Sequence, residues 1–170
     1  MPGKRVDRRQ FLKSIAASGT VATWPAVASA TLADSSPPKT YSVFTPAQAT
    51  LMEAVVDQLI PPDDFPGGKE AGTVHYIDQK LAGPYGRFYI DRYEKGLRRI
   101  DAVSVEQAGK AFASLPADQQ SLVLHGIAES TEDRDFFNLL LGDTFEGYYG
   151  DPGHGGNRDG ASWKMIGFRG

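Results

Sequence analysis

Apolar residues recur at helical spacing in one segment after another between residues 45 and 149. In none of these segments do apolar and polar residues alternate over several positions between turn signals, as they would in a half-buried strand. The chain has no internal repeat. We therefore predict an all-α fold, a small bundle of about five helices over residues 45–149.

Capping and turn residues set the expected helix boundaries. Thr45, Pro46 and Gln48 form a helix start with a capping box, and Pro61-Pro62 ends that helix. The spacing predicts further helices over residues 71–81, 85–100, 105–115, 116–127 and 132–149. Core spacing assigns Phe88, Tyr89 and Tyr93 to the interior, and the last helix repeats Phe137, Leu140, Leu141, Phe145 and Tyr148 at helical spacing.

The chain begins with the pattern of a twin-arginine export signal, which carries folded proteins across a membrane. Its residues are Arg8, Arg9, Phe11 and Leu12, followed by a short apolar stretch. The small residues Ala28 and Ala30 predict cleavage after residue 30. The alternatives are a chance basic start and a membrane anchor, but a span needs about 20 apolar residues and this stretch is shorter. We interpret residues 1–30 as the signal peptide and 31–44 as a polar linker, and we expect a periplasmic protein.

Composition excludes several classes of function. Removing residues 1–30 takes away five of the 18 basic and one of the 21 acidic residues, which leaves 13 basic and 20 acidic residues. This balance argues against binding to nucleic acid or to an anionic lipid surface. The chain has no cysteine, which excludes disulfides, cysteine-held iron–sulfur clusters, c-type haem attachment and thiolate zinc sites.

A glycine-rich segment, residues 150–170, follows the last predicted helix. Eight of the 24 residues from Gly147 to Gly170 are glycine, against eleven in the preceding 146. Because glycine costs backbone entropy in a helix, we predict a loop here. The segment also carries aromatic residues, which are scarce in disordered tails. We expect an ordered loop that packs on the helical body or on another protein.

No residue pattern in the chain predicts a catalytic, cofactor-binding or metal-binding site. Gly153, Gly155 and Gly156 lack the spacing of a dinucleotide-binding loop and follow a helix instead of a strand. His75 and His125 fall in predicted helices, far apart in sequence. Turn chemistry explains Asp63-Asp64 and the run Asn157 to Gly160 better than paired catalytic carboxylates or a calcium loop does.

The C-terminal residues nevertheless resemble a known family. Gly147-Tyr148-Tyr149, Asp151-Pro152, Gly155 to Gly160 and Trp163-Lys164 with Ile166 to Phe168 are similar to the C-terminal signature of the gluconate 2-dehydrogenase subunit 3 family. The resemblance covers most of residues 45–170 and includes the twin-arginine leader. It extends through the Ile60-Pro61 turn and the segment that holds Phe112, Leu115, Gln119, Gln120 and Leu124.

The resemblance implies a non-catalytic small subunit of a periplasmic flavin-dependent gluconate or sugar dehydrogenase. FAD is then expected on a large flavoprotein subunit, and haem c on a third, multihaem cytochrome subunit where one is present. The small subunit would stabilise the large one, present the signal to the twin-arginine translocase for both, and join the membrane through the complex. We assign partner binding to the tail: Tyr148, Tyr149, His154, Asn157, Arg158, Trp163 and Phe168.

Two alternatives belong to other classes of protein. One is a stand-alone periplasmic enzyme that uses His154 with the nearby carboxylates of Asp151 and Asp159. The other is a module that binds a small ligand or a metal ion through the same residues. Simple packing of the tail on its own body is the alternative to partner binding.

Overall fold

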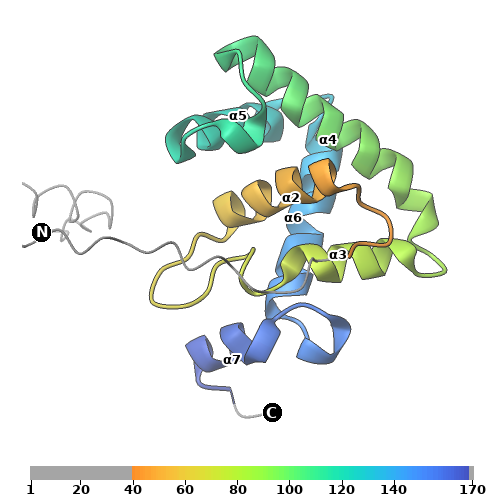
Figure 1. Ribbon diagram of the computed structural model, residues 1–170, viewed down its shortest axis with the longest axis vertical. Coiled ribbons are helices and arrows are strands. Elements are labelled where there is room, and N and C mark those ends of the chain that lie inside the picture. The colour runs from red at the N-terminus through yellow and green to blue at the C-terminus, as the bar shows by residue number, and fades with distance from the viewer. Residues whose placement is uncertain (1–39, 169–170) are drawn as a thin grey trace, which may run out of the picture. The chain divides into compact units, whose positions relative to one another are not determined.

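The computed structural model describes residues 40–168, and this part contains helices, turns and loops without a β-strand. The all-α prediction is thus confirmed. The described residues belong to one unit, Lys39–Gly170. The twin-arginine signal, the cleavage site and residues 31–39 of the linker lie outside the described residues. Figure 1 shows α2 (Pro46–Leu59), α3 (Thr73–Ala82), α4 (Arg87–Ala108), α5 (Ala117–Glu129), α6 (Arg134–Tyr149) and α7 (Ala161–Ile166).

The entry to α2 is fixed by side-chain caps. The Thr45 hydroxyl accepts a hydrogen bond from the Gln48 backbone N–H, and the Gln48 side chain accepts one from the Thr45 N–H, so the predicted capping box is present. Just before it, the buried carboxylate of Asp78 accepts the N–H groups of Ser42, Val43 and Phe44 at 2.7, 2.9 and 2.9 Å. One side chain of α3 therefore holds the segment that leads into the bundle.

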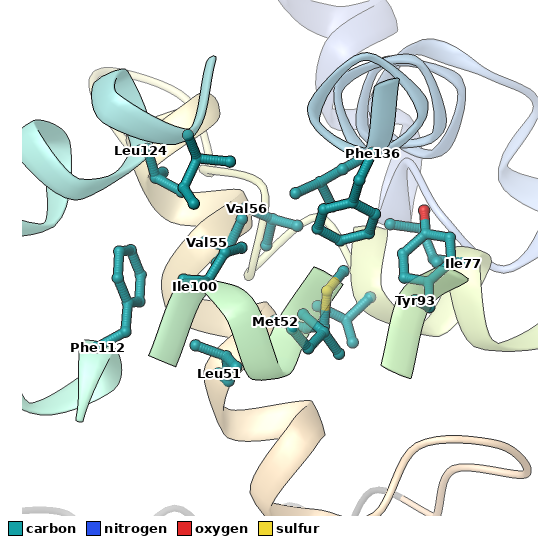
Figure 2. Close-up of a cluster of buried hydrophobic side chains, with 14 of the residues drawn as sticks. Leu51, Met52, Val55, Val56, Ile77, Tyr93, Ile100, Phe112, Leu124 and Phe136 are labelled. Atoms are coloured by element: carbon teal, nitrogen blue, oxygen red, sulfur yellow. The ribbon is translucent and has the colours of Figure 1, made fainter. Parts of the chain in front are cut away.

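Helix α2 supplies the middle of the core. In Figure 2 its Met52, Val55 and Val56 lie between two groups of side chains. Leu124 of α5 and Phe112 of a short 3₁₀ turn (Phe112–Ser114) lie to one side, and side chains of α3, α4 and α6 lie to the other. The three α2 side chains are fully buried. Apolar burial of this kind is the main stabilising term of such a bundle.

The helix predicted over residues 105–115 is wrong. Helix α4 continues to Ala108 and ends at Gly109, whose φ of 68° is in the left-handed region that glycine adopts without strain. The chain then returns through the turn at Phe112. The Phe112 N–H donates to the Asp101 carboxylate of α4 at 2.8 Å. The sequence signal at residues 105–115 thus combines the end of one helix with a buried aromatic turn.

Two core assignments also need correction. Of the three aromatic residues assigned to the interior, only Tyr93 is buried, with 1% exposure, whereas Phe88 is 66% and Tyr89 42% exposed. Phe88 and Tyr89 both lie in the first turn of α4. In α6 the buried face carries Phe136, Leu140 and Tyr148, whereas Phe145 is 44% exposed. Within residues 40–168, no helix has the length and apolar character needed to cross a membrane.

Candidate partner-binding surface

The glycine-rich tail is ordered and more helical than predicted. It contains two 3₁₀ turns, Pro152–His154 and Arg158–Gly160, and the helix α7. The tail folds back against the C-terminal end of α6, where α7 packs (Figure 1). The loop prediction fails here because a local entropy argument omits the tertiary contacts that offset the glycine cost.

Asn157 holds the tail together. Its side chain is fully buried; its amide nitrogen donates to the Gly150 carbonyl at 2.8 Å, and its amide oxygen accepts from the Ser162 N–H at 2.9 Å. Its own N–H donates to the Gly147 carbonyl at 2.8 Å. With φ of 43°, Asn157 adopts the left-handed conformation that asparagine tolerates better than most residues. The turn interpretation of this run is confirmed.

Close packing explains two of the tail glycines. A Cβ added to Gly156 would lie 2.1 Å from the Gly147 carbonyl oxygen, so any side chain there would force the tail off α6. At Gly155, which has φ of 91°, it would lie 2.7 Å from the Gln79 amide oxygen of α3. Glycine therefore serves close packing here, as it does where two backbones approach each other.

Further hydrogen bonds join the end of α6 and the tail to the loop before α3. The Tyr148 hydroxyl donates to the Pro66 carbonyl at 2.8 Å, and burial raises the pKa of this phenol. The Arg158 N–H donates to the Ala71 carbonyl at 2.9 Å, and its guanidinium reaches the Glu70 carbonyl. The inner side of the tail is thus part of the folded body.

The outer side of the tail presents aromatic rings. The rings of Phe145 and Tyr149, one turn apart on α6, have centroids 6.1 Å apart, and those of Trp163 and Phe168 are 5.0 Å apart. The Trp163 indole N–H donates to the Tyr149 carbonyl at 3.2 Å, which joins the two pairs. Phe145, Tyr149 and Phe168 are 44%, 46% and 53% exposed. We call Phe145, Tyr149, Trp163 and Phe168 together the tail aromatic surface.

The structure therefore divides the seven residues assigned to partner binding. Tyr148 and Asn157 are buried and hold the tail in place. Tyr149, Trp163 and Phe168 form the outer surface, and His154 and Arg158 are exposed beside turns. Sequence reasoning missed Phe145, although its spacing of four residues from Tyr149 places both on one helix face. Both self-packing and an exposed aromatic surface are present in the same segment.

The residues proposed for a stand-alone enzyme do not converge. The Asp151 carboxylate accepts the Gly153 N–H at 2.7 Å and so caps a turn. Within residues 40–168, no hydrogen bond or ion pair joins the side chains of Asp151, His154 and Asp159. The same part of the chain has no group of three or more histidine, aspartate or glutamate side chains placed to hold a metal ion.

The other candidate side chains lie apart from the tail or serve turns. His125 is exposed on α5 beside Glu129, and the His75 ring nitrogen lies 2.8 Å from the Gln79 amide nitrogen within α3. The Asp63 carboxylate accepts the Phe65 N–H at 2.9 Å, which confirms a turn.

A polar cluster joins α3, α4 and α6 and extends from the buried Asp143 to the exposed Glu146. The Asp143 carboxylate accepts from the Tyr93 hydroxyl at 2.6 Å and from the Lys80 ammonium at 2.8 Å. Lys80 also contacts Glu146, which accepts from the Tyr76 hydroxyl at 2.9 Å. Asp143 is buried, and the cluster links segments up to 70 residues apart in sequence.

The pKa shifts in this cluster favour a structural role. Burial alone would lower the pKa of Lys80, but hydrogen bonds to Asp143 and Glu146 outweigh it and raise the pKa above its usual value. Burial, aided by Asp143, raises the pKa of Tyr93 well above that of free tyrosine. A general acid or base works best with a pKa near the operating pH. Neither side chain meets that condition.

The family of the chain follows from a comparison with known protein families. Residues 46–170 match the family model described as gluconate 2-dehydrogenase subunit 3. The match covers most of the chain, from the start of α2 through the tail. The chain belongs to this family. No curated protein and no solved structure matches the chain. For a gluconate 2-dehydrogenase subunit 3 chain, the tail aromatic surface is the natural candidate for contact with another subunit.

Proposed function

We propose that this chain is the non-catalytic small subunit of an exported, flavin-dependent gluconate or sugar dehydrogenase. Family membership carries the proposal, since the family is named as one subunit of a dehydrogenase. The described residues offer no convergent catalytic groups, so the chemistry is assigned to FAD on a large subunit. A multihaem cytochrome c is the proposed electron acceptor where a third subunit is present.

The tail aromatic surface supports the binding part of this proposal. Tyrosine and tryptophan often dominate the energy of protein interfaces, because they bury large areas with little loss of side-chain entropy. Here Tyr149 ends α6, and Trp163 stands on a tail that Asn157 and close glycine contacts fix to the body. Such a surface is preorganised, which lowers the entropic cost of association.

Export is the second part of the proposal. The residues Arg8 and Arg9 would direct the folded pair to the twin-arginine translocase, so the flavoprotein would reach the periplasm after taking up FAD. Association with the membrane would come through the complex. One chain would thus supply both the signal and the stabilising contact for its partner.

Co-expression with the flavoprotein subunit of the same organism tests both parts. We expect FAD and dehydrogenase activity to co-purify with this chain from the periplasm. The change Arg8→Lys with Arg9→Lys leaves the pair in the cytoplasm, and Tyr149→Ala with Phe168→Ala reduces the co-purified flavin about tenfold or more. Leu122→Ala, at an exposed position on α5, is the control and leaves recovery unchanged.

The results separate the two parts. A flavoprotein that reaches the periplasm equally well with the lysine pair would contradict the export role. Full recovery of flavin with the tail variant would contradict the binding role of the tail aromatic surface. Dehydrogenase activity from this chain purified alone would overturn the non-catalytic assignment.

A further inference from the structure

A pocket of about 310 Å³ lies at the corner between α3 and α4. It is open to the surface between the end of α3, the loop at residues 83–86, the first turn of α4 and the middle of α6. Its size is at the lower end of the range for small-molecule sites, about 300–1,000 Å³, so it suits one side chain better than a cofactor. Its apolar lining comes from Leu81, Pro84, Tyr85, Tyr89 and Leu139.

The charged groups in this lining neutralise each other. Lys80 and Asp143 are the pair joined at 2.8 Å, and the second oxygen of Asp143 accepts from Tyr93. A charged ligand would therefore lose its hydration shell in the pocket and would find no unpaired group of opposite charge there. The pocket is complementary to an uncharged, apolar group.

The rim of the pocket is aromatic and basic. Tyr85 and Phe88 are 80% and 66% exposed, so an apolar surface extends outward from the pocket. Arg92 lies one turn after Phe88 on the same flank of α4, and Lys95 follows it. Neither cation pairs with a carboxylate among the described residues. The exposed Asp91 lies four residues before Lys95 on α4, so Arg92, one turn after Tyr89, is the cation of this pair that borders the pocket.

The pocket and the tail aromatic surface both border the exposed side of α6. Leu139 lines the pocket, and Phe145 and Tyr149 belong to the tail aromatic surface. The exposed Gly142 and Glu146 lie between them; Gly142 adds no side chain, and the Glu146 carboxylate is paired with Lys80. The ten helical steps from Leu139 to Tyr149 span about 15 Å. One interface of ordinary size, about 800 Å² on each partner, can cover that distance.

We propose that this corner pocket receives an apolar side chain of the flavoprotein subunit, flanked on that subunit by a carboxylate that meets Arg92. The proposal rests on the proposed function and adds a second anchor to the tail aromatic surface. Its basis is the apolar pocket, the unpaired Arg92 one turn from Tyr89, and the exposed side of α6 that leads to the tail aromatic surface. An anionic membrane is the rival occupant, but Asp91 and Glu94 interrupt the basic residues of α4, and such a membrane favours an uninterrupted basic cluster.

The test measures the Kd between the purified flavoprotein subunit and the folded small subunit. Tyr85→Glu places a charge at the mouth of the pocket, and Arg92→Glu reverses the charge of the rim. Both side chains are exposed, so the core is unaffected. We expect each variant to weaken binding about tenfold or more. The controls Leu122→Glu and Lys110→Glu make the same changes at exposed positions away from the pocket and shift Kd by less than about twofold.

The possible results are distinct. If the unaltered chain does not bind the flavoprotein, the proposed function fails and this inference fails with it. If it binds and both pocket variants bind equally well, only the inference is overturned. Vesicles with 30 mol% phosphatidylserine provide the third measurement. Binding of these vesicles that is lost in the variants, while flavoprotein binding persists, would assign the corner to a membrane instead. Thermal melting of each variant confirms that it is folded.

Discussion

Asp78 and Asp143 are the two carboxylates buried among residues 40–168, and each meets several donors. Asp78 accepts three successive backbone N–H groups, and Asp143 accepts a phenol and an ammonium group. Buried charges persist in proteins only when they are paired and hydrogen-bonded in this way. Sequence alone does not identify them, because nothing in the helical pattern separates these two aspartates from the exposed acidic residues around them.

Glu146 gives this cluster a dependence on pH. The hydrogen bond from Lys80, assisted by Tyr76, lowers the pKa of Glu146 below its usual value of 4.5. A carboxyl group whose pKa is lower in the folded state stabilises the fold above its unfolded pKa and loses that contribution as the pH falls. We expect wild type to be more stable than Glu146→Gln at pH 7, with the difference shrinking below a pH of about 4.5.

Urea denaturation from pH 7 to pH 3 measures this difference. The control is Glu132→Gln, which removes an exposed carboxyl group without a described partner. An offset for Glu146→Gln that stays constant or grows toward acid pH would contradict the assigned ion pair.

At the scale of elements, sequence spacing located the helices more reliably than their covered faces. The capping box at Thr45 and the left-handed Gly109 are local signals, and local signals define helix ends. Whether a side chain is buried depends on which other helix packs over its turn. Tyr93 of α4 packs against Phe136 of α6 and is buried, whereas Phe88, in the first turn of α4, is exposed. Long-range contacts likewise gave the tail its fold, which its glycine content did not predict.

The crossing of α4 and α6 depends on Gly96. A Cβ at this position would lie 2.2 Å from the Phe136 ring, so the helices meet at a point where α4 has no side chain. We expect Gly96→Ala to destabilise the fold by about 1–3 kcal/mol, as overpacking of a core does. The matched control is Gly126→Ala in α5, where the nearest neighbour of the added atom is 4.0 Å away; it stabilises by about 0.5–1 kcal/mol.

Guanidinium denaturation of the two alanine variants gives both values. Combining Gly96→Ala with Phe136→Leu should recover part of the loss, since residues in direct contact do not act additively. Equal stabilities for Gly96→Ala and Gly126→Ala would show that the crossing is looser than described.

At the scale of the whole molecule, the tail links the stability of the bundle to its binding surface. Its inner residues bond to α6 and to the loop before α3, and its outer residues carry the rings proposed to meet a partner. Within about twenty residues, the inner side of the tail thus stabilises the fold and the outer side is proposed to bind a partner. Sequence composition indicated that the segment was unusual, but only the structure shows why glycine is required. A Cβ on Gly156 would meet the backbone of Gly147, one on Gly147 would meet the Tyr76 ring, and Gly155 has a φ of 91° beside the Gln79 side chain.

Gly156→Ala tests this link. The added methyl group would lie 2.1 Å from the Gly147 carbonyl oxygen, so the tail must leave α6 or shift on it. We expect faster limited proteolysis within residues 150–168 and flavoprotein binding weakened about as much as by Tyr149→Ala with Phe168→Ala. The bundle from α2 to α6 keeps its helical signal in circular dichroism, because its core lies elsewhere.

Gly153→Ala, where the added atom meets only the Asp151 carboxylate at 3.1 Å, is the control. If partner binding is lost without any change in proteolysis, displacement of the tail is not the cause of the loss. If the tail is cleaved faster but the affinity is unchanged, the tail is not part of the interface.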